Sequence, residues 1–109
     1  MKILLDECLP VGFRHAFPNH EVHSAEWAGL KGKENGELLQ AAEESGYEVL
    51  LTVDQGLPHH QRPADQKLAI VVIRARTNQL EDLLPLVEGI IDVLQSIQPG
   101  DNIRIPKIT

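Results

Sequence analysis

The chain has 109 residues, the size of one domain, and 42% of them are hydrophobic, which is enough for a single core. Its 16 acidic and 10 basic residues give a formal net charge of −6, which argues against a protein that holds nucleic acid by bulk electrostatics alone. No apolar run approaches the roughly 20 residues that span a bilayer, no secretory signal opens the chain and Cys8 is its lone cysteine, so we expect a reduced, cytoplasmic protein without a membrane partner.

The first predicted elements are a strand, a helix and a weaker strand. Residues 3–5 form a short continuous apolar run, which is typical of a strand that is buried on both faces. Residues 9–17 contain two phenylalanines, and we expect a helix there that ends at Pro18. Residues 21–23 are a weaker candidate for a strand.

The middle of the chain predicts a helix followed by two buried strands. Asn35 can cap a helix that runs to about Ser45, and Gly46 can supply its left-handed stop. Residues 49–53 and 69–73 are runs rich in valine, isoleucine and leucine. Such runs, bounded by turn or polar residues, fit strands with both faces covered.

The last third of the chain predicts a helix and an edge strand. Apolar residues keep helical spacing over residues 80–97, and Asn78 with Glu81 three residues later has the pattern of a capping box. Pro85 should kink this helix near its second turn. Residues 102–105 alternate as an edge strand does, and a proline stops them.

Strands that alternate with helices imply right-handed crossovers and a mostly parallel sheet with helices on both faces. The predicted fold class is therefore α/β, in the form of a small three-layer α/β/α sandwich that makes a single domain over residues 1–109. Three glycine- or proline-containing stretches are expected to be loops, namely residues 27–33, 55–66 and 99–100.

Acidic residues follow two of the predicted strands and open one predicted helix. Asp6 and Glu7 follow the first strand, and Asp54 follows the next buried strand along the chain. Glu37 falls in the first turn of the helix near Asn35, where the helix dipole favours a carboxylate. Ligands of open α/β sheets bind beyond the carboxyl ends of the strands, so we expect these acids at one edge of the sheet.

The acids predict a site for a hard divalent cation. Mg²⁺ and Mn²⁺ prefer oxygen ligands, and proteins commonly hold them with one or a few carboxylates together with waters and phosphate oxygens. Asp6, Glu37 and Asp54 are the predicted metal ligands and catalytic acids. The hydroxyl of Thr52 could orient a carboxylate or a metal-bound water.

Two arginines follow the strand at 69–73. Arg74 or Arg76 could bind a phosphate in a forked contact. Acids, a divalent cation and arginines at one edge together imply hydrolysis of a phosphodiester by a metal-activated water.

Each of these residues also has a plain structural interpretation. Asp6 could cap the first helix, Asp54 could initiate a turn, and Glu37 could be a solvated acid at a helix start. Arg74 and Arg76 could pair with the acids that follow them in the chain. The joint placement of these residues at one edge favours the functional interpretation.

The histidines and the single tryptophan give weaker signals. His59 and His60 are adjacent, and His20 and His23 fall on opposite faces of a strand, so a zinc site is not expected. Trp27 is expected to be a partly buried anchor of its loop, with stacking on a nucleobase as the alternative.

Five stretches of the sequence carry a resemblance to a known family. They are MKILLDECLP, the HEV segment with the following Trp-Ala-Gly-Leu loop, NGELLQAAE, VLLTVDQGL and IVVIRARTNQLEDLLPLV. Together they resemble the PIN-like family of small bacterial proteins, which was long catalogued as a domain of unknown function. The resemblance covers nearly the whole chain.

The resemblance implies a PIN-like fold and a Mg²⁺- or Mn²⁺-dependent endoribonuclease that acts as the toxin of a toxin–antitoxin pair. RNA would then be the substrate and a cognate antitoxin protein the partner, with a homodimer left open. On this resemblance Asp6, Glu37 and Asp54 match the family's acids. Glu7, Asn35 and Thr52 would have secondary or orienting roles.

Departures from the family pattern keep two other functions open. Asn35 stands where many members have an acid, Gly56 stands where they have Asp or Asn, and residues 58–63 differ as well. The chain could therefore be a catalytically lapsed domain that only binds a partner.

A phospho-acceptor receiver domain is the third possibility. Its pattern has paired acids after the first strand, an Asp acceptor after the third, a Thr after the fourth and a Lys after the last. Asp6 and Glu7, Asp54, Thr77 and Lys107 fall in that order. The proline precedes Lys107 here, whereas in receivers it normally follows the lysine.

Overall fold

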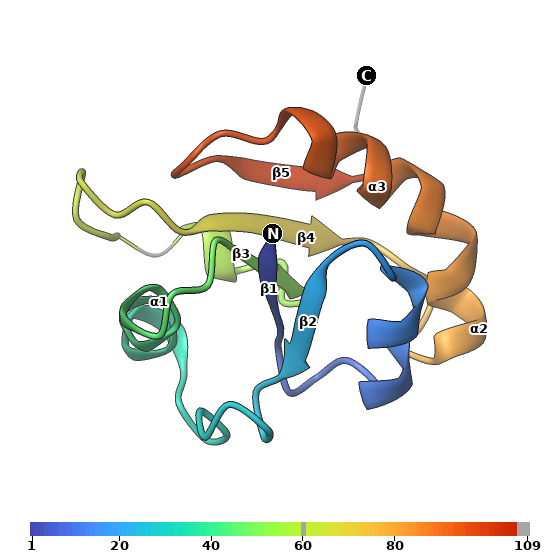
Figure 1. Ribbon diagram of the computed structural model, residues 1–109, viewed down its shortest axis with the longest axis horizontal. Helices are drawn as coiled ribbons and strands as arrows, with labels where there is room; N and C mark the ends of the chain where they lie inside the picture. The colour runs from blue at the N-terminus through green and yellow to red at the C-terminus, as the bar shows by residue number, and fades with distance from the viewer. Residues whose placement is uncertain (60, 107–109) are drawn as a thin grey trace.

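A computed structural model of the chain describes residues 1–59 and 61–106, and a single sheet of five parallel strands forms its centre (Figure 1). The strands are β1 (Lys2–Leu5), β2 (Glu21–Ser24), β3 (Val49–Thr52), β4 (Ala69–Ile73) and β5 (Asn102–Ile105). Their order is β2-β1-β3-β4-β5, and all four neighbouring pairs are parallel. The predicted α/β fold class is confirmed, with a sheet that is wholly rather than mostly parallel.

Four short helices cover one face of the sheet. They are η1 (Val11–Ala16), α2 (Leu80–Leu83), η3 (Leu84–Leu86) and α3 (Val87–Ser96). Phe13 and Phe17 meet edge to face in this layer, with ring centroids 5.2 Å apart. They pack in one core cluster with Ile90 and Leu94 of α3 and with inward residues of every strand.

The opposite face carries α1 (Asn35–Glu44) and the short η2 (Leu57–His59). Leu38 and Leu39 of α1 pack with Leu4 of β1 and Leu50 of β3 in a second core cluster. In Figure 1, α1 lies at the left of the molecule and α2 at the right. Helical layers on both faces complete the predicted three-layer sandwich.

The two strands β3 and β4 are buried along their whole length. Leu50 and Leu51 are both 0% exposed and belong to different core clusters, one on each face of the sheet. Because neither face meets water, every position favours an apolar side chain, and the sequence reads as a continuous apolar run instead of an alternating one.

Prolines decide how two of the helices differ from regular α-helices. The first predicted helix is the 3₁₀ helix η1, which fits between Pro10 and Pro18 and has little length to extend. The helix expected over residues 80–97 breaks into α2, η3 and α3 around Pro85, so the predicted kink is confirmed. The longest helices, α1 and α3, have ten residues each, and no helix of the described residues is long and apolar enough to cross a membrane.

Two predicted helix caps are wrong. The N-cap of α2 is Gln79, which forms no side-chain cap, so Asn78 and Glu81 do not make a capping box. The N-cap of α1 is Glu34, and Asn35 is the first residue of the helix, with a positive φ of 52°. A cap depends on the path of the incoming loop as well as on residue type, and the loop before α1 shifts the cap by one residue.

The order of the strands creates a reversal between β1 and β3. From β1 the chain moves outward to the edge strand β2, returns to β3 on the other side of β1, and continues outward through β4 to β5. Such a reversal opens a crevice beyond the carboxyl ends of the two strands that flank it, and ligands of α/β proteins bind there. The carboxyl ends of β1 and β3 therefore locate the candidate site.

Candidate functional site

Asp6 is the first residue after β1, and the main chain fixes its position. Its N–H donates to the carbonyl oxygen of Leu51 on β3 at 2.9 Å, so the pairing of the two strands continues past the end of β1. Its Oδ1 accepts the N–H of Glu7 at 2.8 Å. Glu7 is exposed. A carboxylate oxygen can accept from two directions, so Asp6 keeps room for a cation.

Thr52, the last residue of β3, connects Asp6 with Asp54. Its hydroxyl donates to Oδ2 of Asp6 at 2.7 Å and accepts the N–H of Asp54 at 3.0 Å. The side chain is 0% exposed, so water does not compete for these bonds. One buried hydroxyl thus holds the carboxylate of one strand end against the main chain of the other.

Asp54 has one carboxylate oxygen in a turn and one that is open. Its Oδ1 accepts the N–H of Gly56 at 2.9 Å, which is the geometry of an Asx turn. The turn-forming interpretation of Asp54 therefore holds for this oxygen. Its Oδ2 has no hydrogen-bond donor among residues 1–59 and 61–106, which leaves it for a ligand.

A hollow of about 330 Å³ lies between the carboxyl ends of β1 and β3. Its lining comes from the segments after β1 and β3 and from the start of α1: Asp6, Glu7, Cys8, Lys33, Glu34, Asn35, Leu38, Asp54 and Leu57. Four of these residues are acidic and one is basic. The hollow is therefore a negatively charged depression at the predicted edge of the sheet.

The negative field also acts on the thiol beside the hollow. Burial raises the pKa of Cys8, a backbone hydrogen bond at Val53 lowers it, and the charge of Asp6 raises it again. The net direction is upward, so the thiol is protonated at neutral pH. A protonated thiol is a poor nucleophile, which makes Cys8 a neutral neighbour of the carboxylates.

Glu37 lies in the first turn of α1, as expected, but its carboxylate is not part of the hollow. Its Oε1 is 3.4 Å from Nζ of Lys33, and the side chain is 69% exposed. Glu34 lines the hollow instead. The sequence-based assignment missed Glu34 because it placed the helix cap at Asn35, although an acid directly before a predicted helix was a usable signal.

The arginines lie on the neighbouring strand end, apart from the hollow. Arg74 and Arg76 follow β4, are exposed, and within the described part of the chain form no ion pair with the acids of α2. Gln55 lies between the two strand ends, since its amide donates to the carbonyl oxygens of Val53 at 3.1 Å and Ile73 at 3.0 Å. A ligand would have to extend over Gln55 to reach both the acids and the arginines.

The side chains around the hollow can supply only a few of the ligands that a hard cation needs. Their donors are carboxylate and amide oxygens, which Mg²⁺ and Mn²⁺ prefer over softer ligands. Yet no group of three or more His, Cys, Asp or Glu in the described residues is arranged to hold a metal ion. Asp6 and Asp54 both line the hollow, so a cation bound there would take few ligands from the protein and most from water or phosphate oxygens, as Mg²⁺ commonly does.

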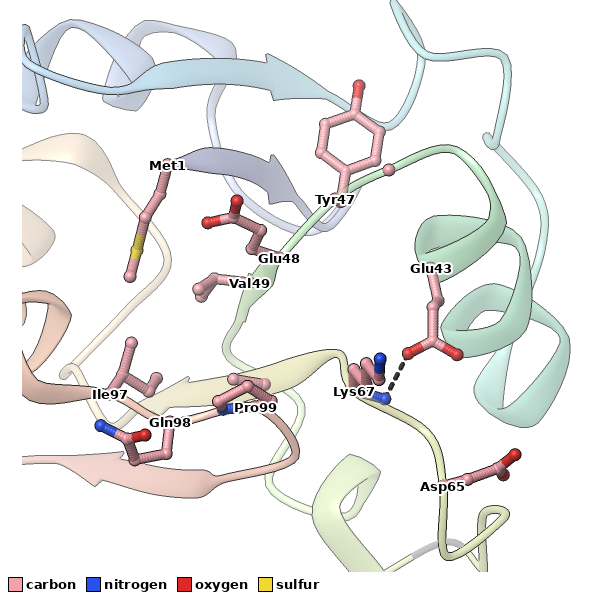
Figure 2. A pocket seen from close by; sticks show the side chains of 12 residues that line it. Met1, Glu43, Tyr47, Glu48, Val49, Asp65, Lys67, Ile97, Gln98 and Pro99 are labelled. Atoms are coloured by element: carbon pink, nitrogen blue, oxygen red, sulfur yellow. Dashed lines mark hydrogen bonds between the residues drawn. The ribbon is translucent and has the colours of Figure 1, made fainter.

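A larger hollow of about 480 Å³ lies at the opposite edge, near the amino ends of the strands (Figure 2). Met1 and Ile97 point toward each other across it, and Glu43 stands at its rim. Glu43 accepts the N–H groups of Lys67 and Leu68, so its carboxylate has a structural use. None of the predicted site residues lines this hollow.

The remaining sequence hypotheses have mixed outcomes. Asp6 does not cap the first helix, because the N-cap of η1 is Pro10. Thr77 donates its hydroxyl to Asp82 and accepts the N–H of Gln79, so it is engaged at the start of α2. Lys107, the other residue of the receiver pattern, lies outside the described residues.

Trp27 differs from its expected role. The side chain is 70% exposed, so the prediction of a partly buried anchor is wrong. Ala25 and Leu30 are the buried residues that anchor this loop. The tryptophan is left in solvent near the end of β2.

Comparison of the chain with models of protein families, with curated proteins and with solved structures found no match. The function is therefore argued from the geometry at the carboxyl ends of β1 and β3.

Proposed function

We propose that this protein is a metal-dependent endoribonuclease that hydrolyses RNA phosphodiesters with Mg²⁺ or Mn²⁺ at the hollow between β1 and β3. The observation that carries the proposal is the bridge in which the buried hydroxyl of Thr52 binds both Asp6 and the main chain of Asp54. The bond from Thr52 ties the Asp6 carboxylate to the turn that carries Asp54, which a helix cap at Asp6 would not require.

Asp6 and Asp54 have the chemistry of a cation site in this proposal. A sheet hydrogen bond holds Asp6 in place and the hydroxyl of Thr52 holds the main chain of Asp54, and each carboxylate retains free acceptor capacity for a cation. When bound, Mg²⁺ or Mn²⁺ would supply an activated water and neutralise charge on the phosphate. The negative hollow would otherwise repel a phosphate, so entry of the scissile phosphodiester into the hollow depends on the cation.

The neighbouring residues have positioning roles in the proposal. Thr52 fixes the orientation of the Asp6 carboxylate, and Glu34 supplies a third acid at the rim of the hollow. Arg74 and Arg76, one strand further along, are placed to bind a phosphate of the same RNA strand outside the hollow. The resemblance to PIN-like toxins extends the proposal to a protein antitoxin as partner and to activity in the cytoplasm.

Cleavage of single-stranded RNA by the wild-type chain and by Asp6→Asn tests the proposal. Wild type should cleave with Mn²⁺ or Mg²⁺ and not with chelator, and the variant should lose on the order of 100-fold or more in rate. Asp92→Asn is the matched control, because it removes the same charge from an exposed position on α3. Metal-independent cleavage, or equal rates for wild type and Asp6→Asn, would refute the proposal.

Substitution of two glutamates tests which one is the third acid of the site: Glu34, which the structure indicates, or Glu37, which the sequence indicated. Glu34→Gln should slow cleavage because Glu34 lines the hollow, whereas Glu37→Gln should leave it nearly unchanged because Glu37 faces solvent and Lys33. The reverse result would restore Glu37 as the third acid.

The other two functions predict different results in the same preparation. A lapsed partner-binding domain gives no cleavage and no Mn²⁺ binding by calorimetry, with or without Asp6→Asn. A receiver domain gains the mass of one phosphoryl group on incubation with a small phosphodonor, and loses that gain in Asp54→Asn.

A further inference from the structure

An ordered loop holds Trp27 in solvent. At 70% exposure it is the most exposed large hydrophobic side chain of the described residues. The loop around it is well bonded: the N–H of Ala28 donates to the carbonyl of Ser24 at 3.0 Å, and the N–H of Leu30 donates to that of Ala25 at 2.8 Å. An indole is one of the most favourable side chains to bury, so its exposure on a well-bonded loop points to an external partner.

One face of the indole is already covered by a fixed ring. His23 of β2 stacks on Trp27 with ring centroids 3.9 Å apart and an angle of 30° between the rings. Both ring nitrogens of the imidazole have partners. Its Nδ1 hydrogen-bonds the hydroxyl of Tyr47 at 2.9 Å, and its Nε2 lies 3.6 Å from a carboxylate oxygen of Glu21. The indole is therefore backed on one side by His23, while most of the side chain, 70%, is left in solvent.

The loop that carries Trp27 connects β2 with the residues before α1 that line the hollow, while the indole itself lies over His23 of β2. It begins at Ala25, whose N–H donates to the carbonyl of Leu5, the residue before Asp6, at 3.0 Å. Trp27 follows Ala25 by two residues, which span at most about 7 Å of main chain. The loop then continues from β2 to α1, as Figure 1 shows, and reaches the hollow at Lys33.

The charges near Trp27 favour stacking over phosphate contacts as the source of binding. Lys31 and Lys33 follow Trp27 in the chain, and Glu21 and Glu26 precede it. A surface with this balance does not attract a duplex through its backbone. It can bind an unpaired base, because every base presents an aromatic face and because only single strands leave that face free.

We propose that Trp27, backed by His23 of β2, is a stacking platform on which a single-stranded RNA that enters the carboxylate hollow places one of its unpaired bases. The inference rests on the proposed ribonuclease function, because it states how that site receives its substrate. It also explains how a chain of net charge −6 binds RNA: the affinity comes from stacking.

Fluorescence of the single tryptophan gives a direct test. Trp27 is the only tryptophan in the chain, so its emission reports on this position alone. Titration of the full chain with a short single-stranded oligoadenylate RNA in chelator should quench the emission. The same oligoadenylate paired with oligouridylate should not, because its bases are stacked inside a duplex. Absence of quenching by the single strand would overturn the proposal and leave the indole to a protein partner.

Substitution measures how much the platform contributes. With fluorescein-labelled oligoadenylate and anisotropy detection, Trp27→Ala should weaken binding between about 5-fold and about 150-fold, and Trp27→Phe should weaken it less. Leu84→Ala, which removes another exposed hydrophobic side chain on the far face of the sheet, should leave affinity unchanged. Equal affinity of Trp27→Ala and wild type would overturn the proposal.

The salt dependence distinguishes stacking from phosphate binding. If only Lys31, Lys33, Arg74 and Arg76 contact phosphates, the slope of log affinity against log salt concentration should be about −2.8 or shallower. A slope several times steeper would mean that backbone charge carries the binding, and it would overturn the stacking proposal.

Asp6→Asn separates this proposal from the ribonuclease proposal. The variant should still show quenching of Trp27 by oligoadenylate, while it no longer cleaves. Quenching without cleavage in wild type would keep the platform and refute the nuclease. Cleavage without quenching would do the opposite.

Discussion

Thr52 is 0% exposed, so its hydrogen bonds with Asp6 and Asp54 cannot be exchanged for bonds with water. Removal of the hydroxyl would leave a carboxylate oxygen and a backbone N–H without their partner. The residue therefore contributes both to the stability of the sheet edge and to the orientation of the Asp6 carboxylate. These two contributions can be measured separately.

Thr52→Val removes the hydroxyl and keeps the shape of the side chain. We expect the free energy of unfolding, measured with urea, to fall by about 1–3 kcal/mol, since a hydrogen bond to a charged carboxylate and one from a backbone N–H are both lost. Cleavage under folding conditions should fall about 10- to 100-fold, as for other groups that orient a metal ligand. Thr52→Ser keeps the hydroxyl and should retain most of the stability and most of the cleavage rate of wild type. Loss of stability at unchanged cleavage would limit Thr52 to a structural role.

Cys8 reports on the charge of Asp6 without any need for activity. Burial first and then the Asp6 carboxylate raise the pKa of the thiol, against a backbone hydrogen bond that lowers it. The rate of alkylation by iodoacetamide in chelator should therefore reach half its maximum at a pH above the ordinary value of 9.0. In Asp6→Asn that pH should shift downward, because one raising cause is removed. The same midpoint in both proteins would mean that the thiol and the carboxylate are not adjacent.

At the residue scale, the residues that follow the carboxyl ends of the strands could be predicted from the sequence. Asp6, Thr52 and Asp54 could be placed at one edge because buried parallel strands are visible as apolar runs, and the residue after each run stands at the carboxyl end. Glu34 and Trp27 could not be placed. Their positions depend on the path of the loop between β2 and α1, which long-range contacts decide.

At the element scale, the turn before β5 depends on a glycine. Gly100 has a φ of 83°, and a Cβ built on it would lie 3.3 Å from the carbonyl oxygen of Gln66. Its own carbonyl accepts a guanidinium N–H of Arg62 at 2.7 Å, and its N–H donates to the carbonyl of Lys67 at 2.9 Å. The turn thereby ties the β3–β4 connection to the start of β5.

Gly100→Ala should lower the free energy of unfolding by about 1–2 kcal/mol, because an L side chain is strained in this region of backbone conformation. Gly36→Ala is the matched control. Gly36 lies in α1 with no atom within 4 Å of its added Cβ, and alanine is the better helix former, so this variant should be neutral or slightly more stable. Urea unfolding followed by circular dichroism compares the two. Equal effects would mean that the turn tolerates a side chain.

The elements themselves were predictable where local chemistry dominates. Pro85 breaks the helical segment from Leu80 to Ser96 because a proline removes one hydrogen bond and crowds the preceding turn. The 3₁₀ form of η1 was not predicted, since apolar spacing does not distinguish a short 3₁₀ helix from an α-helix. Two flanking prolines, Pro10 and Pro18, were the available signal.

At the scale of the whole molecule, the two helical layers share one sheet. Leu50 and Leu51 of β3 are both fully buried, and each belongs to the core cluster of a different face. Truncation of either side chain removes packing in one layer only. The response of the whole chain shows whether the layers unfold together.

Leu50→Ala and Leu51→Ala should each lower the free energy of unfolding by about 2–5 kcal/mol. That is a large part of the roughly 5–15 kcal/mol that stabilises a domain of this kind. Each variant should still unfold in a single transition, because the strands connect the two layers. Far-ultraviolet and near-ultraviolet circular dichroism should give the same midpoint. Two separate midpoints would show that the layers are independent.

The order of the strands could not be read from the sequence, although their existence and parallel direction could. Pairing of β1 with β3 joins residues that are distant in the chain, and no local pattern encodes such a partner. The same pairing brings Asp6 and Thr52 together. The candidate site was therefore predictable as a set of residues at an edge, but not as a bonded arrangement.

Asp6 and Thr52 are 46 positions apart in the chain, which also delays the assembly of the site during synthesis. At a translation rate of about 5–20 residues per second, the ribosome needs roughly 2–9 s to add the segment that separates the two residues. Until β3 has emerged and paired with β1, the nascent chain carries the Asp6 carboxylate without the hydroxyl that orients it. The arrangement of Asp6 and Thr52 at the candidate site is therefore complete only after β3 has paired with β1, and the cleavage proposed for this site would begin no earlier.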